Sequence, residues 1–82
     1  MKGYCECCGE YGELEKCHIK TKKTGGGTEW ENILLMCRRD HQLQHQVGFY
    51  ALSKRYEKLR IQLELRGWGF ENEFGIMKLR RV

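Results

Sequence analysis

The clearest pattern of apolar and polar positions in the chain lies between Phe49 and Leu63, and it predicts an amphipathic helix. Five apolar residues recur there at spacings of three and four, as on one helical face: Phe49, Leu52, Tyr56, Leu59 and Leu63. The basic residues between them fall off this stripe, so we expect them to be solvated while the stripe faces the core.

Two shorter apolar segments precede this helix and predict a pair of strands. Leu14–Ile19 is the first, and the four-residue apolar run Ile33–Met36 is the second. The polar stretch between them, residues 20–31, contains three consecutive glycines, Gly25 to Gly27. Three glycines in a row lose much conformational entropy in a helix or strand. They therefore predict a turn at which the backbone approaches another group closely.

Two further segments complete the expected elements. His41–Gln46 predicts one or two helical turns with Asp40 as their candidate cap, and Gly48 is expected to bend or break the helix. Gly67 suits the end of the long helix, and residues 67–82 alternate enough to predict a terminal strand or hairpin. The order of these elements predicts an α+β protein.

Length and cysteine content indicate a small domain with a metal staple. A chain of 82 residues buries a modest core, and its five cysteines are an odd number. Cys5 and Cys8 have the Cys-x2-Cys spacing of a metal knuckle. No signal peptide or apolar run of membrane length is evident, so we expect a cytosolic protein with reduced thiols that serve as ligands. The formal net charge of +4 is compatible with nucleic-acid binding without establishing it.

Cys5, Cys8 and the later Cys37 form the first predicted metal site. Thiolates at such spacing favour tetrahedral Zn²⁺, and the ion would tether the amino-terminus to the second strand. The fourth ligand is open among Asp40, His41, Cys17 and Cys7. Asp40 is favoured, because it follows Cys37 by three residues, where a second knuckle would have its second ligand.

A second group of residues has the composition of a phosphodiesterase site, since all three histidines fall between Cys17 and His45. Hydrolysis of a phosphodiester needs an activated water and a cation that offsets the developing negative charge. His18, at the end of the first strand, can take the proton of the water, because imidazoles titrate near neutral pH. His41 and His45 lie four residues apart and can hold the ion from one helical face, while Asn32 can fix the loop.

The sequence resembles the HNH endonucleases of the ββα-metal (His-Me finger) group, from Cys5 to about Gly48. More narrowly, it is similar to small phage-type HNH proteins with a zinc knuckle, and its histidines and Asn32 are arranged as in the colicin nucleases. The resemblance is carried by the motifs CECC, CHIK, TGGGTEWENI, LLMCRRDH and HQLQH. It implies a ββα-metal finger with a structural zinc knuckle, followed by a longer amphipathic helix and a short terminal strand or hairpin.

The resemblance also implies roles for individual residues. His18 falls at the position of the family's general base, and Asn32 at its middle asparagine. His41 falls at the last histidine of the motif, and His45 at a further metal ligand of some members. Cys17 stands where the family usually has an Asp or His that binds the catalytic ion. A ligand set of one Cys and two His is softer than a set with carboxylates, and it favours Zn²⁺, Ni²⁺ or Co²⁺ over Mg²⁺.

The resulting prediction is a metal-dependent HNH endonuclease that hydrolyses the phosphodiester bonds of DNA. Its catalytic residues would be His18, Asn32 and His41, and its ion (Zn²⁺, Ni²⁺, Mn²⁺ or Mg²⁺) would be held by His41, His45 and Cys17. Five basic residues would position phosphates without reading bases, or be merely solvated: Lys20, Lys22, Lys23, Arg38 and Arg39. The alternative is a non-catalytic zinc protein that binds DNA or assists phage recombination or packaging, and a third is a purely structural zinc protein.

We expect a single domain over residues 1–82. Within it, residues 1–47 would form the zinc knuckle and ββα core, and residues 48–82 the supporting helix and the C-terminal strand or hairpin. DNA is the expected partner, and a homodimer would suit cleavage of both strands, although no residue requires one. We expect no membrane association and a place in the cytosol of a bacterium or of a phage-infected host.

Overall fold

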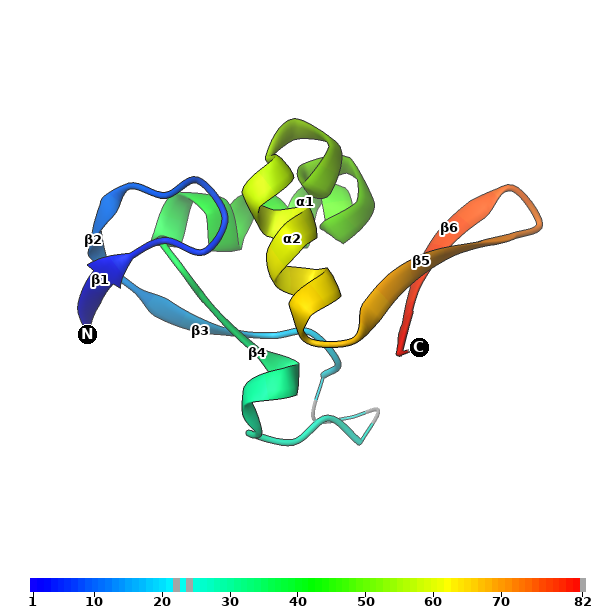
Figure 1. Ribbon diagram of the computed structural model, residues 1–82, viewed down its shortest axis with the longest axis horizontal. Helices are drawn as coiled ribbons and strands as arrows, with labels where there is room; N and C mark the ends of the chain where they lie inside the picture. The colour runs from blue at the N-terminus through cyan, green and yellow to red at the C-terminus, as the bar shows by residue number, and fades with distance from the viewer. Residues whose placement is uncertain (22, 24, 82) are drawn as a thin grey trace.

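The computed structural model describes residues 1–21, 23 and 25–81 and confirms the α+β class. The elements are, in chain order, β1 (Lys2–Tyr4), β2 (Tyr11–Glu13), β3 (Glu15–His18), the 3₁₀ turn η2 (Trp30–Asn32), β4 (Ile33–Met36), α1 (Arg38–Arg55), α2 (Glu57–Leu65), β5 (Trp68–Glu73) and β6 (Ile76–Arg81). Figure 1 shows the β3–β4 pair beneath the two helices, with the hairpins β1–β2 and β5–β6 at opposite ends of the molecule. No helix in the described part of the chain is long and apolar enough to cross a membrane.

The two predicted central strands exist and pair antiparallel, with Cys17 opposite Leu34 and His18 opposite Ile33. Successive side chains of a strand point to opposite faces. Accordingly Cys17, Leu34 and Met36 are buried in the core, while His18 and Ile33 are only half-buried. The apolar run Ile33–Met36 therefore forms a strand with one buried face, and β3 delivers His18 at its last position.

The amino-terminal knuckle is framed by a hairpin that the sequence pattern did not predict. β1 and β2 pair with Tyr4 opposite Tyr11, and the centroids of these two rings lie 5.1 Å apart in an edge-to-face contact. Each strand has only three residues, which is too short for an alternating pattern to be recognised. The hairpin brings the two ends of the cysteine-rich loop together.

The prediction that the helix begins at His41 with Asp40 as its cap is wrong. Helix α1 begins at Arg38, and Cys37 is its N-cap residue, with extended backbone and no side-chain cap bond. Asp40 consequently lies in the first helical turn. The break at Gly48 is confirmed, because this residue has φ 84° and ψ 168° in the middle of α1, a conformation that favours glycine.

The apolar stripe from Phe49 to Leu63 packs into the core, but not as one helix. Leu52, Leu59 and Leu63 are each at most 1% exposed. Tyr56 has extended backbone (φ −123°, ψ 104°) and separates α1 from α2. The expectation of a continuous helix is therefore wrong, because the spacing of apolar residues reports which side chains face the core, not whether the backbone between them is unbroken.

The C-terminal segment forms a hairpin, one of the two predicted outcomes. Its turn consists of Phe74 and Gly75, which have φ values of 54° and 83°, as in a type I′ turn. Trp68 is 6% exposed, and its indole Nε1 donates a hydrogen bond of 2.6 Å to the carbonyl of Glu31. This contact holds the foot of the hairpin against the turn η2.

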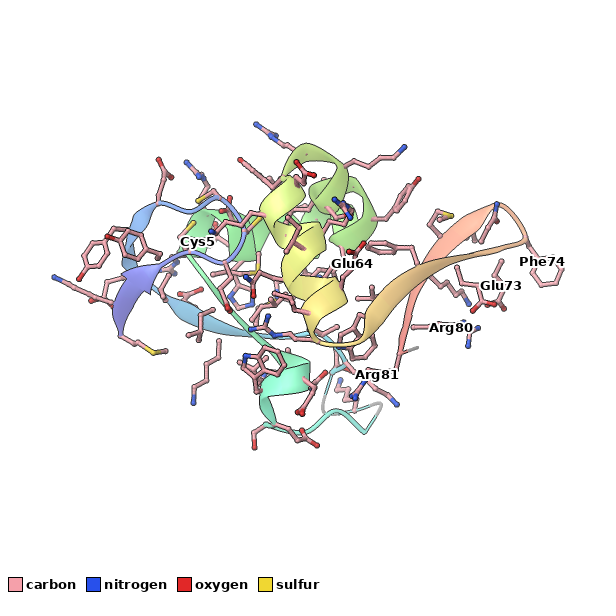
Figure 2. All side chains as sticks on the ribbon, viewed as in Figure 1. Cys5, Glu64, Glu73, Phe74, Arg80 and Arg81 are labelled. Atoms are coloured by element: carbon pink, nitrogen blue, oxygen red, sulfur yellow. The ribbon has the colours of Figure 1, made fainter. Side chains whose placement is uncertain are left out.

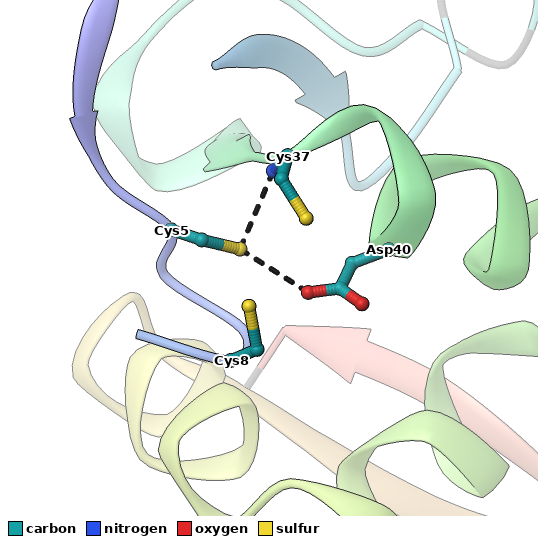
Figure 3. A group of neighbouring side chains, drawn as sticks. All are labelled: Cys5, Cys8, Cys37 and Asp40. Atoms are coloured by element: carbon teal, nitrogen blue, oxygen red, sulfur yellow. Dashed lines mark hydrogen bonds between the residues drawn. The ribbon is translucent and has the colours of Figure 1, made fainter. Parts of the chain in front are cut away.

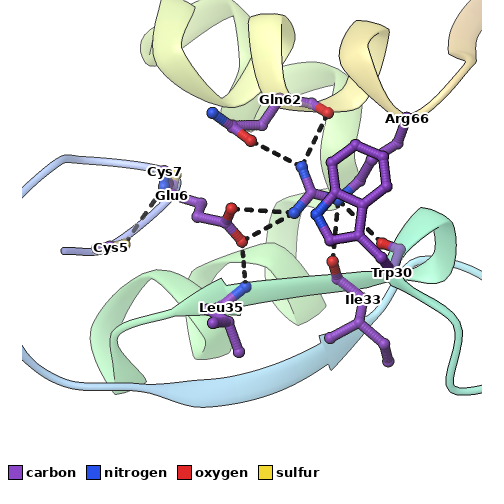
Figure 4. A network of polar contacts seen from close by, with 8 residues as sticks. All are labelled: Cys5, Glu6, Cys7, Trp30, Ile33, Leu35, Gln62 and Arg66. Carbon is purple, nitrogen blue, oxygen red and sulfur yellow. Dashed lines mark hydrogen bonds and ion pairs between the residues drawn. The ribbon is translucent and has the colours of Figure 1, made fainter. Parts of the chain in front are cut away.

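A buried ion pair fastens α2 to the knuckle and to β4 (Figure 4). The Arg66 side chain is 1% exposed and donates two hydrogen bonds to the Glu6 carboxylate, of 3.1 and 2.9 Å. It also donates to the carbonyls of Trp30 and Ile33, at 3.1 and 3.0 Å. Glu6 in turn accepts a 2.7 Å hydrogen bond from the backbone N–H of Leu35. The network joins three segments that are far apart in sequence.

Candidate metal centre and catalytic residues

The structure brings together the residues of the predicted knuckle (Figure 3). The ligand atoms of Cys5, Cys8, Cys37 and Asp40 all lie within 4.8 Å of one another. Cys5 and Cys8 come from the loop between β1 and β2, while Cys37 caps α1 and Asp40 lies in its first turn. Of the four candidates for the fourth ligand, Asp40 is thus the one that lies with the three thiols. We call these four residues the metal cluster.

The geometry and chemistry of the metal cluster suit a closed tetrahedral site. A Zn–S bond of about 2.3 Å implies ligand separations of about 3.8 Å, compatible with the observed spacing. The backbone N–H groups of Cys7 and Cys37 donate to the Cys5 sulfur at 3.4 and 3.3 Å, which would stabilise a thiolate there. Cys5 and Asp40 are fully buried. Four protein ligands leave no open position, which is typical of a structural rather than a catalytic ion.

The charges around the metal cluster favour an ionised Asp40. Burial by itself raises the pKa of Asp40, but hydrogen bonds from the three thiols and the charge of Arg39 together hold its pKa below the usual value. Burial raises the pKa of the Cys8 and Cys37 thiols, so without an ion they keep their protons. Arg39 donates to Asp40 at 3.3 Å and to Glu10 at 2.9 Å.

The two helix histidines are neighbours, and one has a carboxylate partner that sequence analysis missed. The ring centroids of His41 and His45 lie 5.0 Å apart. His41 Nδ1 lies 2.9 Å from the Glu15 carboxylate on β3. A histidine held in this way has its other ring nitrogen, Nε2, available for an ion. No sequence signal marks Glu15, which is one of many charged residues near the strand ends.

Cys17 does not form a close group of metal-ligand atoms with the helix histidines, within the described residues. Cys17 is 1% exposed, and its sulfur lies 3.6 Å from the side-chain oxygen of Gln44 on α1. Burial raises the pKa of Cys17 to about 12, which keeps the thiol protonated at neutral pH. Within the described residues, the metal cluster is the one group of three or more metal-binding side chains whose ligand atoms lie this close together.

His18 and Asn32 lie at the junction of the β3–β4 pair and the glycine-rich loop. The His18 Nε2 atom is buried and, among the described residues, has no hydrogen-bond partner. Asn32 is 5% exposed, and its side chain binds the loop at three points. It accepts from the Lys20 N–H at 2.7 Å and donates to the carbonyls of Lys20 and Gly27 at 3.0 and 2.8 Å. Asn32 therefore fixes the course of the chain directly after His18.

The predicted phosphate contacts have different environments. Lys20, Lys23 and Arg38 are exposed, as a contact with DNA requires. Arg39 is exposed too, but its guanidinium is engaged with Glu10 and Asp40 at the metal cluster. Lys22 lies outside the described residues.

Comparison with known proteins gives one result. The family model described as HNH endonuclease matches residues 5–46, a little over half of the chain. Neither the curated proteins nor the solved structures gave a match. The matched residues contain the whole metal cluster, both strands of the β3–β4 pair and the start of α1. The chain therefore belongs to the HNH endonuclease family.

Proposed function

We propose that this protein is a metal-dependent endonuclease that hydrolyses phosphodiester bonds of DNA, with a structural Zn²⁺ in the metal cluster. One observation carries the proposal. Within the segment that matches the family, His18 ends a strand with its Nε2 atom unpartnered among the described residues, beside a loop that Asn32 holds rigidly. A ring nitrogen without a partner can accept a proton, as a general base must.

Each residue of the candidate site has a separate role in the proposed reaction. His18 takes the proton of the attacking water, and Asn32 keeps the following loop from moving during this transfer. Glu15 orients the ring of His41, which together with His45 would hold a divalent ion. An ion held there would supply positive charge against the charge that develops on the phosphate. Lys20 and Lys23 would contact neighbouring phosphates.

The proposal is tested by nicking of supercoiled plasmid, with Mg²⁺, Mn²⁺, Ni²⁺ or Zn²⁺ added separately. We expect ion-dependent nicking by the wild type. His18→Ala should lower the rate by about 10²–10⁴-fold, the usual contribution of a general base. Lys16→Ala is the matched control, since Lys16 is exposed on the same strand, two residues before His18.

Both variants must first match the wild type in zinc content and in thermal unfolding, so that a loss of activity reports on chemistry. Wild-type rates in folded His18→Ala would overturn the role of His18. Equal losses in His18→Ala and Lys16→Ala would point to a general effect on the strand instead.

A second candidate function is a zinc-containing DNA-binding protein without catalysis, and the burial of Cys17 favours it. Cys17 is protonated and lies beside Gln44, so it would not serve as a thiolate ligand. A catalytic ion would then have only two of its three predicted side-chain ligands, His41 and His45. This function predicts salt-dependent DNA binding and no cutting with any added ion, while the structural ion stays bound.

The remaining expectations stand as proposals. The end of the family match at residue 46 supports a division into a core of residues 1–47 and a supporting part of residues 48–82. A cytosolic location remains an expectation from the cysteine content. Nothing in the described residues supports a homodimer.

A further inference from the structure

A cleft lies between the glycine-rich loop and the foot of the C-terminal hairpin, and its lining includes Lys20 and Asn32, to which roles were given above. Its larger part has a volume of about 540 Å³, within the range of ligand sites in proteins. A smaller hollow of about 180 Å³ shares Lys20, Trp68 and Arg81 with it, so the two are neighbours. The wall begins at Ile19, the residue that follows His18.

The lining of the larger part combines an apolar floor with a cationic rim. The half-buried Ile19 and Leu79 supply the apolar surface together with Trp68, which is 6% exposed. Lys20 and Arg81 supply exposed positive charge, and the Arg81 guanidinium lies 5.5 Å from the centre of the Trp68 ring. A flat, largely apolar group that carries a negative charge fits this combination.

Nearby charges indicate where the negative group would lie. Arg80 also lines the larger part, but it is engaged with Glu71 at 2.8 Å and Glu73 at 2.6 Å. Figure 2 shows Arg81 at the foot of the hairpin and Arg80 farther along it, toward Glu73. The Glu29 carboxylate lines the smaller hollow and would repel an anion there. The anion is therefore expected in the larger part, between Lys20 and Arg81.

The cleft is built before any ligand arrives. Asn32 holds the backbone of Lys20 and Gly27 by three hydrogen bonds, and the Trp68 indole is fixed on the Glu31 carbonyl. At Gly26 a Cβ atom would come within 1.8 Å of the Lys20 carbonyl oxygen, so only glycine permits this close approach. Rigid walls lower the entropy that binding costs.

We propose that this cleft binds one unpaired nucleotide of the DNA strand, with its base on the apolar floor and its phosphate between Lys20 and Arg81. The proposal rests on DNA being the substrate, as proposed above, and it names the form of DNA that the site prefers. A base inside a duplex is stacked and paired and cannot reach such a floor. The preferred substrate is DNA with an unpaired base.

The test compares three DNA duplexes of one sequence: fully paired, with one bulged nucleotide, and with the same bulge made abasic. Binding is measured by fluorescence anisotropy with zinc-loaded His18→Ala protein, which avoids cleavage. A base on an aromatic or apolar surface contributes about 1–3 kcal/mol, so the base-bearing bulge should bind roughly tenfold more tightly than both other duplexes. Because the abasic bulge has the same number of backbone phosphates and lacks only the base, equal affinity for the two bulges would overturn the proposal.

Two variants locate the binding within the molecule. Arg81→Gln should reduce the preference for the base-bearing bulge over the fully paired duplex to less than threefold, because it removes the cation that would bind the phosphate of the unpaired nucleotide. Lys58→Gln removes one charge from α2 near Gly9 of the knuckle, and it should weaken all three complexes equally without changing the preference. An unchanged preference in Arg81→Gln would exclude this cleft.

The two proposals fail in different ways. Plasmid nicking by the wild type with no preference among the three duplexes would leave the nuclease and overturn the nucleotide site. An absence of binding to every duplex would overturn the action on DNA itself, and the nucleotide site with it.

Discussion

At the scale of single residues, Phe74 has a conformation that its side chain disfavours. It is 98% exposed, and its φ of 54° lies in the left-handed region, which glycine and asparagine adopt more readily. Gly75 follows with φ 83°, and its N–H donates to the Asn72 side chain at 2.9 Å. Type I′ turns prefer Asn-Gly, so phenylalanine at this position destabilises the hairpin. Its exposed ring makes no packing contact with the described residues that would offset this cost.

Phe74→Asn should therefore increase the free energy of unfolding by about 0.5–1 kcal/mol, because it relieves left-handed strain and removes no buried contact. Urea unfolding at neutral pH measures the change. Ile76→Asn is the control, since Ile76 is also exposed, at 62%, but lies in β6, where asparagine is unfavourable. A loss of stability in Phe74→Asn would mean that the aromatic ring makes a stabilising contact.

Asn32→Asp tests the residue that holds the loop after His18. The carboxylate keeps the acceptor for the Lys20 N–H, but it loses two donors and faces the carbonyls of Lys20 and Gly27 instead. We expect a loss of about 1–3 kcal/mol in stability, typical of a buried polar group left unsatisfied. Hydrogen exchange should speed up at the amide of Gly26, which bonds to the Thr21 carbonyl, before it does so in α1. Uniform acceleration through the whole chain would contradict a local role.

At the scale of elements, the first turn of α1 and the knuckle are held together by the metal cluster. Metal binding displaces protons from thiols, because only thiolates bind the ion. Burial raises the pKa of Cys8 and Cys37, so these thiols are protonated without the ion. The pKa of Asp40 is lowered, so at neutral pH this carboxylate has already lost its proton.

Zinc uptake by the metal-free protein should release about three protons per ion at pH 7, one from each cysteine of the metal cluster, because ordinary thiols carry their protons at this pH and must lose them to bind the ion. In Asp40→Cys the fourth ligand is also a thiol, and the number should rise to about four. A pH indicator in weakly buffered solution measures the release. Equal numbers for the two proteins would exclude Asp40 as a ligand.

Helix α2 depends on its last residues for attachment to the rest of the molecule. Arg66→Met should cost about 3–5 kcal/mol, because it leaves the Glu6 carboxylate without its partner in a partly buried site. Replacing both residues, Glu6→Gln with Arg66→Met, should cost less than the sum of the single changes. The double-mutant cycle, measured by urea unfolding, gives the coupling between the two elements. If the stability loss of the double variant equals the sum of the two single losses, the Glu6–Arg66 interaction itself makes no contribution to stability.

At the scale of the whole molecule, no sheet has more than two strands, within the described residues. An isolated two-stranded sheet is marginally stable in water, so each depends on the helices and on the core around Leu34, Leu59 and Trp68. The metal cluster and the Arg66 network connect the amino-terminal hairpin to this core. The chain is therefore expected to unfold as one unit.

Removal of the ion should unfold the protein. Structural zinc contributes roughly 10–16 kcal/mol in small zinc peptides, whereas domains as a whole are stable by only about 5–15 kcal/mol. On titration with a strong chelator, tryptophan fluorescence and far-ultraviolet circular dichroism should change together in one transition. Retention of the helical signal after the ion has left would show that residues 48–82 fold without the knuckle.

Much of the backbone and of the candidate site was determined by local sequence. Short patterns predicted the strand pair β3–β4, with the first strand expected over Leu14–Ile19 and observed over Glu15–His18. They also predicted the break at Gly48 and the three cysteines of the metal cluster. Such patterns are readable because they reflect local preferences: alternation for a strand, glycine for a left-handed backbone, and a fixed spacing for thiol ligands around one ion.

Only the tertiary structure decided which polar groups meet. Three contacts join segments that are distant in sequence: Glu15 with His41, Glu6 with Arg66, and Cys17 with Gln44. The break between α1 and α2 at Tyr56 and the cleft beneath the C-terminal hairpin belong to the same class. These features depend on how the elements pack against one another. A buried polar group bonds to whichever partner the packing brings near it, and that partner is usually distant in sequence, so no short sequence pattern predicts the pair.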